Sequence, residues 1–555
     1  MSRKLDLPAL LLFTAILFGI VVRFYPAIAN GFPLNDGGMF FTMTQDLKAN
    51  GYALPYFTNY NHADIPFAYP PFGFYIAALL SALVPDSDLA IFLYLPAVIN
   101  SLSILAFYHF AKEIINSRTS ASLATLIYAL SPRAFVWQIM GGGIPRAFGM
   151  LFLLLMLWQV ILLFRSPKRS HIFLTILFGT GTVISHPQTA LHAALGGFLP
   201  FLFFGLNKRG FISAFFTGLG VALLSSPWWG TVLARHGIEP FISAGQTSQR
   251  TLESYLGILK FDGLGDILFL PILFLALIGI FLTLRQKSYF LFAWALLALL
   301  IDPRGGDGIA LLSLAMLAGM GLVKFSAWIS RVDSEQAEVL FTRRRVQTLW
   351  MGLVIYFVMT AVIFDFQLIN TSLKAGELEM IEWVNENTTE GATFLLATGR
   401  EFSMTDPLQE WFPALTGQKS TTTLQGLEWT LAENFFPWHE QLTLFQHCAD
   451  IACVDEWVAE NDVDYDYLIV MIPREGHRSG LASSLESLGE SAQGSTSHEL
   501  IHRSERALVL ELKKRSGLPV QSVPFFHELI EEFHHHIMPL FGKAFAGGGV
   551  HSVFE

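Results

Sequence analysis

Asn35-Asp36-Gly37-Gly38 stands just beyond the first long apolar segment, residues 8–29. It opens a loop, rich in aromatic residues and prolines, that runs to Tyr69-Pro70-Pro71-Phe72. A carboxylate this close to the end of a membrane helix costs free energy unless water or a function keeps it there. The stretch therefore predicts a first membrane helix followed by an outer loop, and it marks Asp36 as a candidate catalytic residue.

The composition is that of an integral membrane protein. The chain has 555 residues, of which 52% are hydrophobic and 14% charged, whereas soluble domains carry about 25% charged residues. From Phe366 onward there are 28 acidic and 11 basic residues, a net charge of −17, and the preceding part carries +7. The acidic end is expected to be a solvated domain. No pattern typical of nucleic-acid binding is present.

Eleven apolar segments are predicted to cross the membrane. They are residues 8–29, 89–111, 120–132, 147–164, 171–185, 190–206, 211–229, 264–284, 288–301, 308–329 and 348–366. The segment 72–84 is excluded, because counting it would place several basic loops outside, against the cytoplasmic preference of Lys and Arg. We expect it to lie along the outer face.

This topology divides the chain into three parts in the plasma membrane. Residues 1–366 form the membrane domain with a cytoplasmic N-terminus, and its first outer loop is 30–88. Residues 367–515 form an extracytoplasmic α/β domain, with strands predicted at 392–398, 467–471 and 507–512. Residues 516–555 form a helical tail. The predicted fold class is a polytopic α-helical membrane protein, with about 11 transmembrane helices and a C-terminal extracytoplasmic α/β domain.

The acidic part contains the two cysteines of the chain, Cys448 and Cys453. They would pair in an oxidising compartment and would otherwise be free thiols. The sequence leaves both states open.

Two arginines flank a glycine-rich outer loop. Arg146 follows Gly141-Gly142-Gly143, and Arg133 precedes them. Glycines let a backbone approach a ligand closely, and the planar guanidinium suits phosphate. The loop therefore predicts an anion site, and the alternative is that both side chains snorkel to the interface.

Other outer turns also carry polar residues. His186 lies in a tight turn at membrane depth, where it either functions or packs helices together. Arg304 lies between Asp302 and Asp307, so this turn either holds an anion or metal or pairs locally. His62 and Asp64 are candidates for substrate contact, or form a local turn. Trp411-Phe412-Pro413 is expected to pack on the bilayer surface; the alternative is that it covers the membrane site.

Two stretches of the first loop resemble a known family. Asn35-Asp36-Gly37-Gly38-Met39-Phe40 and Tyr69-Pro70-Pro71-Phe72-Gly73-Phe74-Tyr75, with the many spans and the C-terminal domain, look like the glycosyltransferase C (GT-C) superfamily. These transferases use polyprenyl-phosphate-linked sugars. Asp36 matches the family's first-loop aspartate, which deprotonates the acceptor or helps to place a metal. Gly37 stands where many members have a second acidic residue, which weakens the metal-dependent version and leaves a divalent cation (Mg²⁺ or Mn²⁺) open.

The leading hypothesis is an inverting glycosyltransferase in the membrane bilayer. It would move a sugar from a polyprenyl-phosphate donor to a glycan, lipid or protein acceptor at the outer face. Asp36 would act as general base or metal-placing residue, and Arg146, with His186 or Arg304, would stabilise the lipid phosphate. The alternatives are a transporter for a lipid-linked solute and a non-catalytic subunit that serves as a docking platform.

Overall fold

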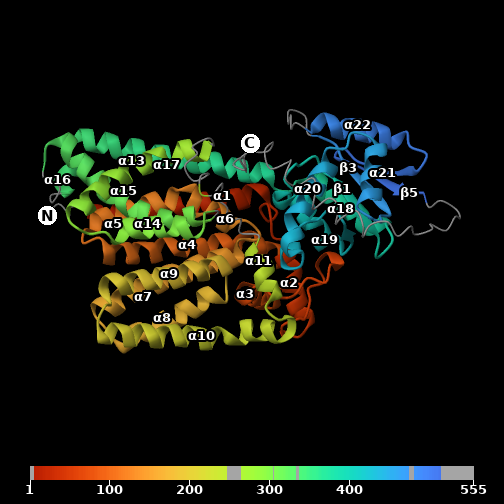
Figure 1. Ribbon diagram of the computed structural model, residues 1–555. Coiled ribbons are helices and arrows are strands. Elements are labelled where there is room, and N and C mark those ends of the chain that lie inside the picture. Colours follow the sequence, from red (N-terminus) through yellow and green to blue (C-terminus); the bar gives the residue numbers. More distant parts are fainter. Residues whose placement is uncertain are drawn as a thin grey trace, which may run out of the picture.

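The computed structural model describes residues 6–246, 255, 264–303, 305–332, 337–473 and 481–513. A bundle of long helices forms one part of the molecule and a small mixed sheet with its helices forms the other (Figure 1). We call these the bundle and the sheet part. The end of the bundle that contacts the sheet part is the sheet end. The predicted tail 516–555 lies outside the described residues.

Each predicted span contains a helix. These helices are α1 (Leu7–Asn30), α4 (Asp88–Ile114), α5 (Arg118–Leu130), α7 (Gly143–Arg165), α8 (Arg169–Val183), α9 (Pro187–Phe204), α10 (Lys208–His236), α13 (Leu264–Arg285), α14 (Phe290–Ile301), α15 (Gly306–Ser330) and α17 (Arg344–Thr371). Within the described residues, seven helices are long and apolar enough to cross a membrane: α1, α4, α7, α10, α13, α15 and the stretch Arg344–Asn387 that includes α17. The chain is therefore a multi-pass membrane protein, and the number of eleven crossings stays a prediction.

The bundle has a buried centre and a lipid-facing periphery. In the apolar window of α15, 72% of the residues are buried, against 22% in α10. Close approach of backbones helps to bury α15, because a Cβ on Gly321 would clash with the carbonyl oxygen of Leu275 in α13. Small residues at such contacts are typical of helix packing in membranes. α15 is thus central, while α10 presents its apolar side chains outward.

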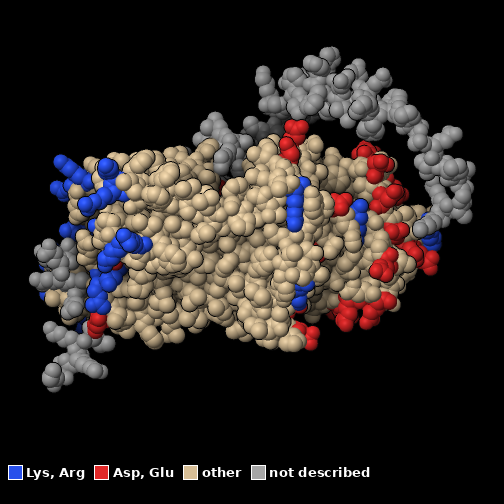
Figure 2. Space-filling model, turned by 90° about the horizontal axis from the view of Figure 1, so that it is seen from below, with Lys and Arg blue, Asp and Glu red and all other residues tan. Residues whose placement is uncertain are grey.

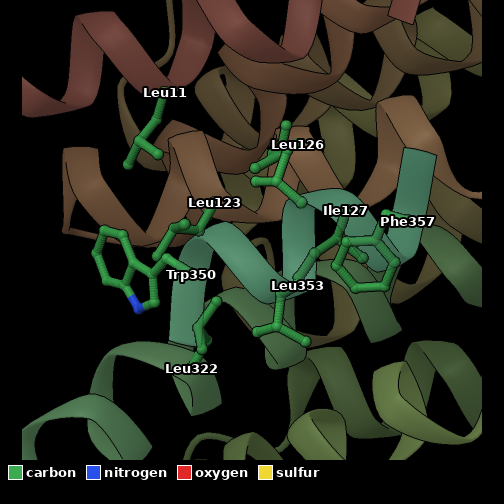
Figure 3. Close-up of a pocket in the computed structure, with 9 residues that line it drawn as sticks. Leu11, Leu123, Leu126, Ile127, Leu322, Trp350, Leu353 and Phe357 are labelled. Atoms are coloured by element: carbon green, nitrogen blue, oxygen red, sulfur yellow. The ribbon is translucent and has the colours of Figure 1, made fainter. Parts of the chain in front are cut away.

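A small apolar pocket lies between α1, α5, α15 and α17 (Figure 3). Leu11, Leu126, Trp350 and Phe357 are among its lining residues, and the whole lining is aliphatic or aromatic. With no ionisable group in its wall, the pocket offers packing space and no acid–base chemistry.

Charge separates along the long axis of the molecule. Lys and Arg gather at the end of the bundle far from the sheet, whereas Asp and Glu cover the sheet part (Figure 2). At the basic end Arg118, at the start of α5, pairs with Asp6 beside the start of α1, at 3.1 Å. This division agrees with the predicted clustering of basic loops on one side.

Short elements fill the junction between bundle and sheet. They are α2 (Gly38–Ala49), η1 (Tyr60–His62), α3 (Phe72–Leu83), η2 (Pro132–Ala134), α6 (Val136–Ile139) and α11 (Glu239–Gln246), and a further short helix, α16 (Ala337–Phe341), precedes α17. In Figure 1, α2, α3 and α11 lie between the bundle and the helices of the sheet part. The helix α3 has 12 residues, as α14 does, so its length alone does not separate it from the short predicted spans, and its non-crossing position stays a prediction.

The sheet part is an α/β layer. Its elements are α18 (Ala375–Asn387), β1 (Thr393–Ala397), η3 (Ser403–Thr405), α19 (Pro407–Thr416), β2 (Lys419–Ser420), η4 (Leu427–Trp429), η5 (Ala432–Asn434), α20 (Phe435–Gln446), α21 (Ile451–Glu460), β3 (Tyr467–Met471), α22 (Ala482–Gln493), β4 (His498–Arg503) and β5 (Ala507–Leu512). The strand order is β2-β1-β3-β5-β4, with β1 parallel to β2 and β3, and β5 antiparallel to β3 and β4.

Alternating side chains of the strands, as in β1, pack into two different hydrophobic cores. In β1, Phe394 and Leu396 pack with α18 and α19, whereas Leu395 and Ala397 face the core formed with α20, α21 and α22. This alternation is the period of a strand covered on both faces. The polytopic fold with a C-terminal α/β layer is therefore confirmed. The three predicted strands correspond to β1, β3 and β5, and the edge strands β2 and β4 were not predicted.

A disulfide joins the two cysteines. Cys448, just after α20, is bonded to Cys453 in α21. The pairing that the sequence left open is thus present in the structure.

Candidate active site

Asp36 lies in a tight loop between α1 and α2 at the sheet end. Asn35 and Gly37 have φ angles of +52° and +125°, so the chain reverses sharply around Asp36. A Cβ on Gly37 would lie 2.5 Å from the carbonyl carbon of Gly141. Only glycine fits this position, because both the backbone angle and the contact exclude a side chain.

Arg146 is the main partner of Asp36. Its Nη2 donates to Oδ2 of Asp36 at 2.5 Å, and the backbone N–H of Gly142 donates to Oδ1 at 2.9 Å. The side chains of Asp36 and Arg146 are 13% and 22% exposed. Both oxygens of the carboxylate therefore accept hydrogen bonds, and the side chain of Asp36 is still partly exposed.

Arg146 is itself fixed by a second contact. Its Nη1 donates to the carbonyl of Trp137, and the guanidinium lies 5.5 Å from the centre of the Trp137 ring. These contacts hold the guanidinium plane against an aromatic face. Interfacial snorkelling therefore does not account for Arg146.

The glycine loop 141–143 contacts the Asp36 loop. The N–H of Gly141 donates to the carbonyl of Leu34, and the N–H of Gly143 donates to Met140. We expected these glycines to bring backbone close to an anion. In the structure the glycine backbone approaches Asp36 and its neighbours, and the binding of an anion at this loop stays a prediction.

A second carboxyl group, that of Glu410 in α19, enters the site from the sheet part. Its Oε1 accepts the N–H of Gly37 at 2.8 Å, and Glu410 is only 6% exposed. Burial, together with the negative charge of Asp36, raises the pKa of Glu410 to about 8. The sequence analysis did not predict this residue. Its one signal in the sequence is an acidic side chain directly before the aromatic pair Trp411 and Phe412.

The neighbouring Trp411 corrects a further expectation. Trp411 and Phe412 are fully buried, and the indole N–H of Trp411 donates to the carbonyl of Asn35 at 2.9 Å. These rings pack between the sheet and the Asp36 loop. The prediction that they pack on the bilayer surface is wrong.

Aromatic side chains and a histidine extend the site. The Tyr69 ring lies 6.4 Å from His186 and 6.0 Å from Trp429, and burial raises the pKa of Tyr69. His186 caps α9 through Nδ1, which accepts the N–H of Thr189. Desolvation and the charge of Arg146 lower the pKa of His186 to about 3, so its ring is neutral.

The other outer-turn residues have partners of their own or lie outside the described residues. Arg133 in η2 pairs with Asp307 at 3.6 Å and lies over Phe269. Arg304 is outside the described residues. Asp302, expected to pair locally, accepts the backbone N–H of Gly305 at the start of α15. It also accepts from Gln188 and contacts His192 of α9 at 3.2 Å.

His62 and Asp64 lie on the turn that faces the sheet part. His62 bonds through Nε2 to the carbonyl of Gly417 at 2.7 Å, and Asp64 is exposed with a φ of +48°. Within the described part of the chain, neither residue forms a hydrogen bond or an ion pair with Asp36. The bond of His62 joins the first loop to the sheet part, and substrate contact by His62 and Asp64 stays a prediction.

The structure also reveals two charges inside the bundle that the sequence analysis overlooked. Arg23 of α1 and Asp365 of α17 are both 0% exposed. Arg23 donates to Asn100 and to the carbonyls of Gly19 and Ala129, yet its Nη2 and both Asp365 oxygens lack a hydrogen-bond partner among the described residues. The only sequence signal was a single charge inside each apolar run.

A divalent cation would need several ligands in the site around Asp36. No three His, Cys, Asp or Glu side chains gather in the described parts of the chain, and Asp36 is occupied by a guanidinium. Mg²⁺ and Mn²⁺ prefer several oxygen ligands. Among the described residues, the side chains around Asp36 do not supply such a set of ligands, and a divalent cation stays a prediction.

The sequence was compared with protein families and with curated proteins. The sequence model of a family described as dolichyl-phosphate-mannose-protein mannosyltransferase matches residues 68–230. No curated protein matches the sequence at a significant level.

Solved structures resemble the whole chain more broadly. ArnT from Cupriavidus metallidurans bound to undecaprenyl phosphate has a TM-score of 0.55 and 14% identity, covering 91% of this chain and 98% of its own. The apo oligosaccharyltransferase of Archaeoglobus fulgidus has a TM-score of 0.53 and 11% identity, covering 94% and 76%. The arabinofuranosyltransferase AftD from Mycobacteria has a TM-score of 0.54 and 15% identity, covering 90% and 40%. At such identities the likeness concerns the fold.

Proposed function

Because the chain has the fold of the glycosyltransferase C superfamily, we propose that it is a membrane glycosyltransferase that takes its sugar from a polyprenyl-phosphate carrier. The family description and the structures of similar fold support this donor class. One of them is bound to undecaprenyl phosphate and another to a dolichol-phosphate and an inhibitory peptide. The acceptor is a glycan, a lipid or a protein.

The observation that carries the proposal is the pairing of Asp36 with Arg146 at the sheet end. In the proposed step, the acceptor hydroxyl oxygen attacks the anomeric carbon of the sugar. The bond from that carbon to the phosphate oxygen breaks, and the bonding electrons leave with the lipid phosphate. The acceptor proton passes to the Asp36 carboxylate, which acts as general base. Attack opposite the leaving group inverts the anomeric centre.

Arg146 has two roles in this proposal. It orients the Asp36 carboxylate by direct pairing, and its bonds to Asp36 and Trp137 use only part of the guanidinium's donor set. The remaining N–H groups would face the departing phosphate, whose charge grows as the bond breaks. His186, neutral and adjacent, would line the same side of the site.

We place the reaction at the outer face of the plasma membrane, with the N-terminus in the cytoplasm. The basic end of the bundle then faces the cytoplasm, as the bias of Lys and Arg requires (Figure 2). The Cys448–Cys453 disulfide supports an oxidising compartment for the sheet part.

The lipid that the purified protein retains tests this proposal. Wild type and Asp36→Asn would be purified from host membranes, and the bound lipid analysed by mass spectrometry. We expect a polyprenyl phosphate in both, with the glycosylated form enriched in Asp36→Asn because transfer is blocked. Asp86→Asn is the matched control, since Asp86 is exposed, lies between α3 and α4 and has a φ of +59° that Asn tolerates. Equal proportions of the glycosylated carrier in wild type and Asp36→Asn would count against the proposal.

A further inference from the structure

The transfer step above leaves one buried carboxyl group of the site without a role, that of Glu410. A buried carboxylic acid is costly unless it is hydrogen-bonded. Glu410 accepts hydrogen bonds from the backbone N–H groups of Gly37 and Met39. Both groups lie at the start of α2, which directly follows Asp36.

These two N–H groups are the ones that a helix start leaves without partners inside the helix. The N-cap of α2 is Gly37, which has no side chain that could cap them. Glu410 therefore supplies from another part of the chain the cap that Asp, Asn, Ser or Thr usually supplies locally. Its separation from Gly37 is 373 residues.

The helix that carries Glu410, α19, and the neighbouring strand β2 are hydrogen-bonded to the first outer loop. The Tyr60 hydroxyl donates to the Glu410 carbonyl at 2.8 Å. Asn61 and Ser420 exchange two hydrogen bonds, of 2.9 and 2.7 Å, so the Asn61 side chain pairs with β2 as a neighbouring strand would. With these contacts, the position of α19 and the position of the Asp36 loop depend on each other.

We propose that Glu410 is a positioning residue, which caps α2 from the sheet part and thereby fixes the direction of the Asp36 carboxylate. This inference rests on the proposed function of Asp36 and adds the means by which the sheet part acts on the reaction. The groups that face Glu410 are Asp36 from its loop, Arg146 from α7 and Tyr60 from η1. Ionisation of Glu410 places a second negative charge beside Asp36 and weakens the alignment of Asp36 with Arg146.

Two variants separate the cap from the charge. Glu410→Gln keeps an oxygen that accepts the Gly37 N–H but never ionises. Glu410→Ala removes the cap. The control is Glu433→Gln, at an exposed glutamate of η5. Transfer would be measured from pH 6 to about pH 9, the range that spans the raised pKa of Glu410, together with thermal unfolding of each variant.

We expect Glu410→Ala to lower kcat by roughly 100-fold with little change in KM, since a misplaced catalytic group costs about that much. In wild type, kcat should fall above the pKa of Glu410, and in Glu410→Gln this fall should be absent. A merely structural glutamate would not change the pH profile.

The outcomes also separate this inference from the proposed function. If wild type itself transfers no sugar, the proposed function fails. If wild type is active and Asp36→Asn inactive, but Glu410→Gln keeps the wild-type pH profile, the positioning role is overturned. Should Glu410→Ala fail to fold, the pH profile of Glu410→Gln decides alone.

Discussion

Asp36 and Arg146 are 110 residues apart in the chain, and their side chains form an ion pair of 2.5 Å. The pair joins the loop after α1 to the first turn of α7. It lies where the bundle meets the sheet part, and it holds the carboxylate that we assign as general base.

The geometry of this pair predicts that lysine cannot replace Arg146. A lysine has a single nitrogen at its tip, so it lacks the two separate nitrogens with which Arg146 contacts Asp36 and the Trp137 carbonyl. We expect Arg146→Lys to lower kcat/KM for transfer by roughly 100-fold, the effect of a misplaced catalytic group. Steady-state kinetics on the purified variant measure this, with Arg169→Lys at the basic end as control. Wild-type kinetics in Arg146→Lys would remove the guanidinium from the mechanism.

A methyl group on Gly142 should disturb Asp36 directly. Its Cβ would lie 2.8 Å from Oδ2 of Asp36, closer than a carbon and an oxygen tolerate. We expect Gly142→Ala to lose transfer activity by about 10-fold or more while remaining folded. Gly218→Ala is the matched control, because nothing lies within 4 Å of a Cβ at that helical position. Equal activity in both variants would show that the Asp36 oxygens tolerate displacement.

The buried carboxyl of Glu410 predicts a pH dependence of stability. Its pKa is about 8 in the folded protein, above the ordinary 4.5, so the folded state binds more protons than the unfolded state between these values. The free energy of unfolding therefore falls as pH rises from about 5 to 8, and the loss is complete above the folded pKa.

Thermal unfolding in detergent, followed by tryptophan fluorescence from pH 5 to 9, measures this dependence. Glu410→Gln should flatten the curve of Tm against pH over the range set by the two pKa values. The exposed-site variant Glu433→Gln should leave the curve unchanged. An identical slope in wild type and Glu410→Gln would contradict a neutral Glu410 at pH 7.

The buried charges Arg23 and Asp365 should be energetically coupled. Each attracts the other, and removing one leaves the other buried without its counter-charge. Leaving a buried polar group without a partner typically costs about 1–3 kcal/mol, and more for a charged group. We expect Arg23→Met and Asp365→Asn each to lower the free energy of unfolding, and the double variant to lose less than the two together. Additive losses in a double-mutant cycle would mean that the two charges do not interact.

Much of the bundle follows from local sequence. Each apolar run from 8–29 to 348–366 contains a helix, because a span must satisfy its backbone hydrogen bonds within itself. The same holds for β1, β3 and β5, whose buried apolar runs are visible in the chain. The edge strand β4, His498–Arg503, carries polar residues at most positions, so its pairing with β5 is specified by tertiary contacts.

The site was only half predictable for a related reason. Asp36 and Arg146 stood out, since each is a charge near an apolar span. Glu410 did not, because a glutamate in a water-soluble domain looks like surface until the partner 373 residues away is known. His62 is a candidate for substrate contact because of its residue type and its position in the first loop. Its side chain bonds instead to the carbonyl of Gly417 and joins the loop to the sheet part.

The role of Asp36 as the base in sugar transfer is tested most directly by single-turnover release of the lipid carrier. Wild type, Asp36→Asn and Asp86→Asn would be mixed with glycosylated polyprenyl phosphate and acceptor from host membranes, and free polyprenyl phosphate followed by mass spectrometry. We predict rapid release by wild type and Asp86→Asn, and a rate roughly 100- to 10,000-fold lower in Asp36→Asn, the range that general base catalysis contributes. Release by Asp36→Asn at the wild-type rate would contradict the assignment of Asp36.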